Sequence, residues 1–358
     1  METTTIPGKS SGVWGWLDDR LGIGGLRYPV PRHANSLAYT LGGVTLVSFV
    51  LLVITGIYLA QFYDPTPANA HASVAFITDK AFAGELIRSL HYWLSSAFVV
   101  TLVLHMVRTF VTGSFKAPRE FVWITGVLLF FLAAGLLFSG TVLKQDQEAI
   151  EALAHNNEVA TLFGFLGFWF SADFTHNVSI VTRLYVAHVS ILPVLIAAVL
   201  AVHMLLIKRH RLAPEPWGTP PEIAAREQAE PEATFTSHLK HIGKWGLVLL
   251  GVVLLLAGLA PAALGPAGVE GIEITKPPWY FLWLYPWEDW IGLKALYILP
   301  ALLALGLLAI PFIDRSDQRD PRRRKPWMVL AAVILLAWLG LTIYGAVTVP
   351  VSHTGMGH

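Results

Sequence analysis

The sequence contains no cysteine among its 358 residues. Disulfide bonds, thiolate metal sites and the attachment of haem through thioether bonds are therefore excluded. Charged residues are also scarce, at 14%, whereas hydrophobic residues make up 54%. Because soluble globular domains carry about 25% charged residues, this composition excludes a soluble globular protein and indicates an integral membrane protein.

Long apolar runs occur seven times along the chain. Each reaches or approaches the ~20 residues that a helix needs to cross the hydrocarbon core. We therefore predict an all-α integral membrane protein with seven transmembrane helices. The opening residues contain no apolar segment typical of a cleavable signal peptide, so we expect the first span to direct insertion. The predicted spans cover residues 36–62, 89–107, 121–143, 184–207, 245–263, 295–313 and 327–349.

Lysine and arginine are distributed unevenly between the two sides of this predicted protein. If the N-terminus is inside, 19 of the 25 Lys and Arg residues fall in the N-terminal segment and in the loops after the second, fourth and sixth spans. The other six fall in the opposite loops and the helix ends beside them. Because Lys and Arg accumulate on the inner side of a membrane, we expect the N-terminus inside and the C-terminus outside.

Composition divides the chain into four segments. Residues 1–35 form a lead on the inner surface, in which apolar and charged residues alternate as in a short interfacial helix. Residues 36–207 hold the first four spans. Residues 208–244 are rich in Pro, Glu and Arg and are predicted to be an inner linker. Residues 245–358 hold the last three spans.

Four histidines lie inside otherwise uncharged spans. His91 and His105 are 14 residues apart, and His188 and His203 are 15 apart. Since 14 residues make nearly four helical turns, each pair shares roughly one helix face over a rise of ~21 Å. Ionisable residues inside a membrane are functional candidates by default. Two such helices can hold two metal centres, one above the other.

Glycines repeat the same spacing in the first and third spans. Gly42 and Gly56 are 14 residues apart, as are Gly126 and Gly140. Glycine permits another group to approach the backbone closely, which a flat macrocycle at each histidine level would need. With the predicted topology, the eight residues sort into two layers. The outer layer is His91, His188, Gly56 and Gly140, and the inner layer is His105, His203, Gly42 and Gly126.

Paired imidazoles of this kind suit haem iron. Two histidines on one iron occupy both axial positions, so such a haem transfers electrons and does not bind substrate. Zinc is disfavoured because its ligands converge on one point. Arg88, Arg108 and Arg183 lie where haem propionates would emerge, although each could also be an interfacial residue. We predict two non-covalent haem b groups, each with two histidine ligands.

Several stretches resemble cytochrome b of the Rieske/cytochrome b complexes, which are quinol:cytochrome c or plastoquinol:plastocyanin oxidoreductases. The four-span and three-span halves are similar to the chloroplast and cyanobacterial cytochrome b and subunit IV, here fused through 208–244. The matching stretches are YTLGG (39–43), LIRSLH (86–91), LHMVRTFVTGSFKAPRE (104–120), VWITGV (122–127), TRLYVAH (182–188), ILP (191–193) and WYF (279–281).

The resemblance implies a dihaem subunit that moves electrons between two quinone sites on opposite sides of an energy-transducing membrane, in a Q cycle with proton translocation. It further implies a Rieske iron–sulfur protein and a c-type cytochrome as partners. A homodimer within a larger complex, in contact with membrane lipid, is also implied. We expect no nucleic-acid partner.

Three positions depart from the family pattern. Thr40 stands where the split-type family has a cysteine that holds an extra haem, so we expect no covalent haem on this chain. The outer-site motif Pro-Glu-Trp-Tyr reads Pro277-Pro278-Trp279-Tyr280 here, without its acid. Lys144-Gln145 replaces a Pro-Trp pair before Asp146.

The missing acid leaves the proton acceptor of the outer quinone site undefined. Proline cannot accept a proton from quinol. Our hypothesis is that another acid replaces it, with Glu288 first and Glu273 second, and with Asp289 and Asp146 as further candidates. At the inner quinone site, Lys208 and His33 are candidates, and both could equally contact lipid headgroups.

Two other functions stay open at this point. The chain could be a dihaem anchor that exchanges electrons between quinone and a redox subunit other than a Rieske protein, without normal outer-site quinol oxidation. It could also be a transporter whose histidines relay protons. A visible spectrum with haem bands would exclude the transporter.

Overall fold

The computed structural model describes residues 12–26, 28–168 and 170–353. Within these ranges, seven helices are long and apolar enough to cross a membrane. The prediction of an all-α membrane protein with seven spans is confirmed. The spans are α2 (Leu37–Ala60), α4 (Gly84–Val111), α5 (Glu120–Val142), α8 and α9 together (Ile180–His210), α11 (Phe235–Leu259), α12 and α13 together (Tyr285–Ile313) and α14 (Lys325–Val347).

Two of these spans are compound. In the fourth, α8 (Ile180–Val186) and α9 (Leu192–His210) are joined by the π-helical turn Ala187–Ile191. In the sixth, α12 (Tyr285–Ile291) and α13 (Ala295–Ile313) are joined by the 3₁₀ turn Gly292–Lys294. The shorter helices are α1 (Val13–Leu21), α3 (Ala70–Asp79), α6 (Gln147–Leu162), α7 (Phe165–Phe168) and α10 (Pro220–Ala229), with further 3₁₀ turns at Ile23–Leu26, Arg32–Asn35, Ala172–Phe174 and Pro321–Arg323.

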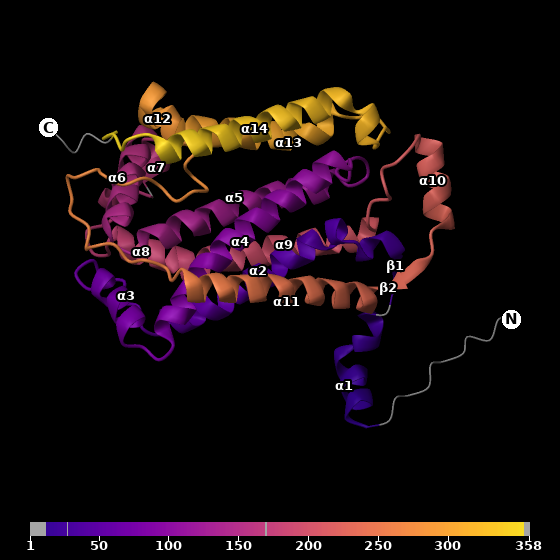
Figure 1. Cartoon of the computed structure of the whole chain (residues 1–358), viewed down its shortest axis with the longest axis horizontal. Coiled ribbons are helices and arrows are strands. Elements are labelled where there is room, and N and C mark those ends of the chain that lie inside the picture. The colour runs from indigo at the N-terminus through magenta and orange to yellow at the C-terminus, as the bar shows by residue number, and fades with distance from the viewer. Residues whose placement is uncertain (1–11, 27, 169, 354–358) are drawn as a thin grey trace.

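The first four spans pack as two helix pairs. Helix α2 lies against α4, and α5 lies against α9. The last three spans do not form a separate bundle. Helix α11 lies along α2 and α4, whereas α13 lies along α5, so the C-terminal half flanks the four-helix unit on two sides (Figure 1).

The connecting elements gather at the two ends of the bundle (Figure 1). Helices α1 and α10 lie at one end, whereas α3, α6, α12 and the tail 348–353 lie at the other. An odd number of spans requires this separation of the N-terminal and C-terminal parts. Following the predicted orientation, we call the end with α10 the inner end and the end with α6 the outer end.

The segment 208–244 is more ordered than a plain linker. It contains α10 and the strand β2 (Glu232–Thr234), which pairs antiparallel with β1 (Pro29–Pro31) of the lead. Helix α11 also begins at Phe235, ten residues before the predicted fifth span. Its first turns contain His238, Lys240 and Lys244. Because these residues are polar, this part of the helix does not form part of an apolar run in the sequence.

A buried ion cluster fastens the C-terminal half at the inner end. Lys116, in the loop after α4, donates to Asp314 Oδ1 at 2.5 Å, and Arg324 donates to Asp314 Oδ2 at 2.7 Å. Arg324 also donates to the carbonyls of Phe110 and Val111. Burial alone would raise the pKa of Asp314, but hydrogen bonds from Lys116 and Arg324 outweigh it and hold the pKa below its usual range.

An Asp314→Asn variant is expected to lose about 3–5 kcal/mol of stability, because it leaves two buried cations without their counter-charge. Unfolding in detergent, followed by intrinsic fluorescence, measures the loss. Since the pKa of Asp314 is lowered by folding, its contribution persists down to pH 3.8 and fades only as the pH falls through the lowered pKa. Asp317→Asn changes an exposed carboxylate in the same loop and is the control; equal losses in the two variants would contradict the cluster's role.

Candidate functional site

The π-helical turn explains the unequal histidine spacing. His91 and His105 lie on the regular helix α4, whereas His188 lies in the π turn Ala187–Ile191 and His203 lies in α9. A π turn takes up about one residue more than an α turn. The 15 residues between His188 and His203 therefore cover nearly the same rotation as 14 residues in α4, so both pairs can face the centre of the bundle.

Each of the four paired glycines packs against one imidazole ring. A Cβ atom at Gly42 would come within 2.8 Å of the His105 ring, closer than real Cβ contacts allow. The group that packs against each of these glycines is thus the histidine ring itself. The pairs and their Cβ-to-Cε1 distances are Gly42–His105 (2.8 Å), Gly56–His91 (3.4 Å), Gly126–His203 (3.5 Å) and Gly140–His188 (2.9 Å).

Hydroxyl groups orient three of the four rings. Thr55 lies 2.9 Å from His91 Nδ1 and donates its own proton to the Leu51 carbonyl. Nδ1–H of His91 is therefore the donor to Thr55, which leaves a lone pair on Nε2 for a metal. In these contacts the hydroxyl belongs to the residue just before the paired glycine. Leu41 is the residue before Gly42, so the His105 ring has no such hydroxyl beside it. The equivalent contacts are Thr125–His203 (2.9 Å) and Ser139–His188 (3.0 Å).

The rings of His91 and His188 face one another across the bundle at one level. The centroids of His91 and His188 are 6.4 Å apart, with the ring planes at 64°. An ion bonded to both rings at roughly 2 Å per bond needs a ring separation of roughly 6 Å. His105 interacts electrostatically with His203 at the second level. The donor set and the separation both fit bis-histidine haem, which stays a prediction for these residues.

Arg108 supplies a further observation that fits haem. Its guanidinium stacks on the ring of Tyr39 at 3.4 Å and reaches Ser114 at 3.5 Å. Its Nε and Nη2 atoms are buried and have no hydrogen-bond partner among the described residues. Because buried unpaired donors are costly, an anionic group such as a haem propionate fits this position.

Two other predicted propionate partners bind backbone carbonyls. Arg88 donates to the carbonyls of Ala262 and Ala263 at 2.6 and 2.7 Å, which ties α4 to the segment after α11. Arg183 donates to the Ser171 carbonyl at 2.6 Å. Their role toward haem stays a prediction. Thr40 is fully buried and donates to the Leu37 carbonyl; the absence of a covalent haem stays a prediction.

A Gly42→Ala variant is expected to bind the inner haem less tightly, because its methyl group would displace the His105 ring. The haem content should fall from two per chain toward one. Gly126→Ala is the matched control at the same level, since its Cβ would meet the His203 ring at an ordinary 3.5 Å. The pyridine haemochrome assay measures both, and equal losses in the two variants would refute the steric explanation.

The Pro278-Trp279-Tyr280 segment contacts the spans at the outer end. Trp279 donates to the Ser96 hydroxyl at 3.2 Å on α4. Tyr280 is hydrogen-bonded to Thr141, near the end of α5, and interacts electrostatically with Glu148 of α6. Burial raises the pKa of Tyr280. The altered motif therefore contacts α4 directly and interacts electrostatically with Glu148 at the start of α6.

An acid that the sequence reasoning missed stands beside this motif. Lys144 donates to Glu148 at 2.5 Å, one helical turn further along. Burial raises the pKa of Glu148 even though Lys144 opposes the shift. The only hint in the sequence was the four-residue spacing from Lys144. Asp146 instead caps α6 by accepting from the Ala149 amide at 3.1 Å, and lies 3.3 Å from Lys144.

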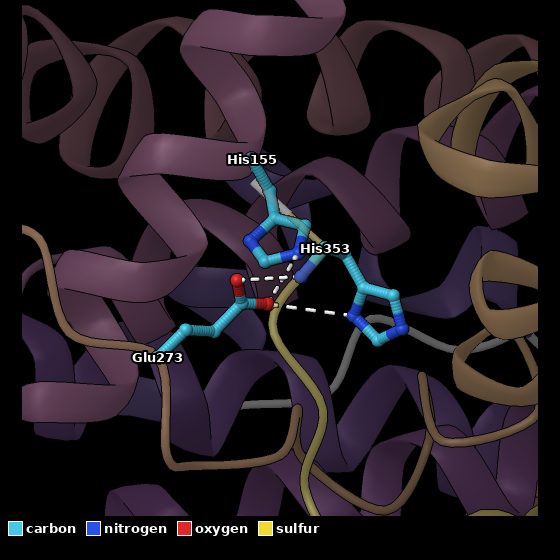
Figure 2. A group of neighbouring side chains, drawn as sticks. All are labelled: His155, Glu273 and His353. Carbon is cyan, nitrogen blue, oxygen red and sulfur yellow. Dashed lines mark hydrogen bonds and ion pairs between the residues drawn. The ribbon is translucent and has the colours of Figure 1, made fainter. Parts of the chain in front are cut away.

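The two acids ranked first from the sequence occur together elsewhere at the outer end. Glu273 and Glu288 both lie within 3.4 Å of His155 on α6. His353 of the C-terminal tail joins the group (Figure 2). Asp289 pairs with His353 at 2.6 Å. The structure thus places Glu148 within electrostatic range of Tyr280, and collects Glu273, Glu288 and Asp289 around two histidines.

The inner-end candidates have structural partners. His33 pairs with Glu230 at 2.7 Å through Nδ1, and its Nε2 lies 3.0 Å from the Ala213 carbonyl. This buried ring therefore fastens the lead to the segment 208–234. Lys208 lies over the ring of Tyr28 at 5.6 Å. Quinone binding by either residue stays a prediction.

Comparisons with known proteins give the same result for both halves of the chain. Residues 26–211 match the family model for cytochrome b/b6/petB, and residues 271–357 match that for the C-terminal part of cytochrome b/b6/petD. A cytochrome b6 of Heliobacterium mobile is 37% identical over 203 residues, which is 54% of this chain and 95% of the relative.

Two further comparisons cover nearly the whole chain. A cytochrome bc complex cytochrome b subunit of Chlorobaculum thiosulfatiphilum is 29% identical over 361 residues, with 94% of this chain and 81% of the relative covered. A solved structure described as a hyperthermophilic respiratory Complex III has a TM-score of 0.71 at 23% identity, with 94% and 92% covered. This last likeness shows the shared fold.

Proposed function

Because this chain belongs to the cytochrome b/b6 family and is similar to the cytochrome b subunit of a bc-type complex, we propose that it is the dihaem subunit of a quinol-oxidising Rieske/cytochrome b-type complex. Membership implies electron transfer, b-type haem and interaction with quinone. The particular haem ligands, quinone sites and partners proposed below go beyond what membership implies.

The observation on which the proposal chiefly rests is the pair of imidazoles at each of two levels. His91 and His188 would hold the outer haem, and His105 and His203 the inner haem. When bound, each haem supplies a one-electron carrier without an open coordination position. The chain's own contribution is to hold each imidazole in one tautomer and orientation, through Thr55, Ser139 and Thr125. The glycines keep the rings close to the neighbouring helices, and neither haem would be covalently attached.

We propose that the outer quinone site lies between Pro278-Trp279-Tyr280 and the start of α6. There Tyr280 can orient a quinol hydroxyl, and Glu148 can accept its proton. A half-buried carboxylate with a raised pKa is suited to this task, since general bases work best with a pKa near the working pH. The charge of Lys144 favours the ionised carboxylate of Glu148 and so opposes the rise in its pKa.

The acids predicted from the sequence remain alternative acceptors. Asp146 is close to the site, but its carboxylate caps α6 and pairs with Lys144. Glu288 and Glu273 contact His155 instead, and no contact of either with Tyr280 is seen among the described residues. These contacts support ranking Glu148 above Asp146, Glu273 and Glu288 as the proton acceptor.

The proposed partners are a Rieske iron–sulfur protein and a c-type cytochrome at the outer end, with a second copy of the chain and membrane lipid around the spans. The N-terminus would be inside and the C-terminus outside an energy-transducing membrane. The distribution of Lys and Arg and the positions of α1 and the tail at opposite ends support this orientation.

A second candidate function is supported by the altered outer motif. Pro278 and Lys144-Gln145 depart from the family pattern at the same place. In this alternative the subunit is a dihaem anchor that passes electrons between quinone and a redox subunit other than a Rieske protein.

The experiment that separates the two is quinol-dependent haem reduction in the complex isolated in mild detergent. The first proposal expects two low-spin b-type haems, rapid reduction by quinol and a copurifying Rieske protein. Reduction that requires another redox subunit, with no Rieske protein present, would favour the anchor. The absence of haem bands would overturn both.

A further inference from the structure

A compact group of histidine and carboxylate side chains lies at the outer end; it contains none of the proposed haem ligands and neither Tyr280 nor Glu148, but it includes Glu273 and Glu288, the alternative proton acceptors. His155 comes from α6, Glu273 from the segment between α11 and α12, and His353 from the C-terminal tail (Figure 2). One ligand-capable atom of each lies within 4.8 Å of the others. Three segments distant in sequence thus direct polar atoms toward one point.

Both imidazoles have their outward-facing nitrogen occupied. His155 Nδ1 donates to the Glu151 carbonyl at 2.7 Å, and His353 Nε2 pairs with Asp289 Oδ1 at 2.6 Å. The remaining nitrogens, Nε2 of His155 and Nδ1 of His353, point toward Glu273. A carbonyl or carboxylate behind a histidine is the usual arrangement around a metal, because it fixes the tautomer and raises the basicity of the ligand nitrogen.

The carboxylate of Glu273 is held in the same way. Its Oε2 accepts from the His353 amide at 2.8 Å and from the Ser352 hydroxyl at 3.1 Å. Its Oε1 is 3.2 Å from His155 Nε2 and 3.4 Å from His353 Nδ1. One oxygen is therefore fixed by the tail, and the other is presented to the two imidazoles.

A second acid, Glu288, adds an independent observation. Its side chain is 4% exposed, and its Oε1 lies 3.4 Å from His155 Nε2. That oxygen has no hydrogen-bond partner among the described residues, and neither does His353 Nδ1. Buried polar atoms without partners are costly, so this position lacks a group that could satisfy both.

Three separations in the group match those of ligands that share one metal ion: His155 Nε2 to Glu273 Oε1 at 3.2 Å, His353 Nδ1 to Glu273 Oε1 at 3.4 Å and His155 Nε2 to Glu288 Oε1 at 3.4 Å. Two atoms bonded to a tetrahedral zinc ion at about 2.0–2.1 Å each lie roughly 3.4 Å from one another. Nitrogen and oxygen donors suit Zn²⁺, and two carboxylates offset its charge. We propose that a divalent transition-metal ion, zinc in the first place, binds His155 Nε2, His353 Nδ1 and Glu273 Oε1, with Glu288 in reach of the fourth position.

Such an ion would join the tail to α6 and, through Asp289, to α12. His155 is 17% exposed, which gives the ion a path from the outer surface. The site contains none of the proposed haem ligands and does not depend on the outer quinone site. Glu273 and Glu288 would then be metal ligands, and neither would be free to receive a quinol proton.

The test uses the full chain with its haems, treated with a chelator, freed of it and dialysed against micromolar zinc. We expect one zinc per chain, and absorption-edge fine structure that shows histidine ligands with Zn–N/O distances of about 2.0–2.1 Å. His155→Gln and His353→Gln should each weaken binding by more than about 100-fold, and Asp289→Asn by about 10-fold. Magnesium should not compete, because it prefers an all-oxygen site.

His71→Gln is the matched control, since His71 lies at the same end and contacts only the Gly265 carbonyl among its described hydrogen bonds. It should bind zinc as the wild type does. An unchanged haem spectrum shows that each variant is folded. Zinc retained equally by His155→Gln, a fine structure without histidine, or no zinc bound at all would overturn the proposal. The group would then be a cluster of protonated histidines paired with carboxylates.

Discussion

A His105→Ala variant is expected to bind one haem per chain instead of two. His105 and His203 are the proposed ligands of the inner haem, and removing one imidazole would leave that iron with a single protein ligand. The outer level should be unaffected, because His91 and His188 are about 20 Å away along the helices, at 1.5 Å per residue. The pyridine haemochrome assay gives the haem content, and the reduced-minus-oxidised spectrum shows which haem remains.

Thr55→Val is the control for this experiment. It removes the hydroxyl beside His91 and keeps all four imidazoles, so it should retain both haems and shift only the reduction potential of the outer one. If His105→Ala retains two haems, or if Thr55→Val loses one, the assignment of ligands to levels is wrong.

A Glu148→Gln variant is expected to lose quinol-dependent haem reduction by about 10²–10⁴-fold, the usual contribution of a positioned general base. Glutamine fills the same space and can still accept from Lys144, but it cannot take a proton. In the wild type the rate should rise as the pH rises through the raised pKa of Glu148, because only the ionised carboxylate is a base. In the variant this pH dependence should be lost. Rapid mixing with quinol, with inner-site turnover blocked, measures both.

Two controls define the result. Glu158→Gln changes another acid of α6 and should leave the rate unchanged. A variant in which Asp146, Glu273, Glu288 and Asp289 are all replaced by amides tests the acids predicted from the sequence. If that variant is inactive and Glu148→Gln is not, Glu148 is not the acceptor. If neither matters, the outer site is served by water or does not oxidise quinol.

The histidines and glycines could be found from the sequence because their pattern is local. The helical repeat converts a spacing of 14 residues into a shared face, whatever the rest of the chain does. Apolar length and Lys/Arg distribution likewise predicted seven spans and an orientation. The 15-residue spacing of His188 and His203 differs from this pattern by one residue. The π turn around His188 accounts for the extra residue, and the sequence alone does not predict that turn.

The acids could not be ranked in the same way. Glu288 and Glu273 follow the Pro278 motif in sequence or stand just before it, yet they contact His155 and not Tyr280. Glu148, which interacts electrostatically with Tyr280, lies on a helix that precedes the motif by two spans. The sequence pattern also could not predict that segment 208–244 is ordered and pairs through β2 with the lead. Nor could it predict that α11 and α13 flank the four-helix unit.

The sequence alone thus determined the composition-driven features: a membrane protein, seven spans, and four histidines with four glycines at helical spacing. Only the tertiary structure decided which acid interacts electrostatically with Tyr280, that Arg108 keeps two buried donors unpaired, and that His155, Glu273 and His353 converge. The physical reason is the distance along the chain over which each interaction acts. Helix periodicity and hydrophobic length act between neighbours in the chain, whereas a polar atom's partner is chosen by packing among segments that the sequence keeps far apart.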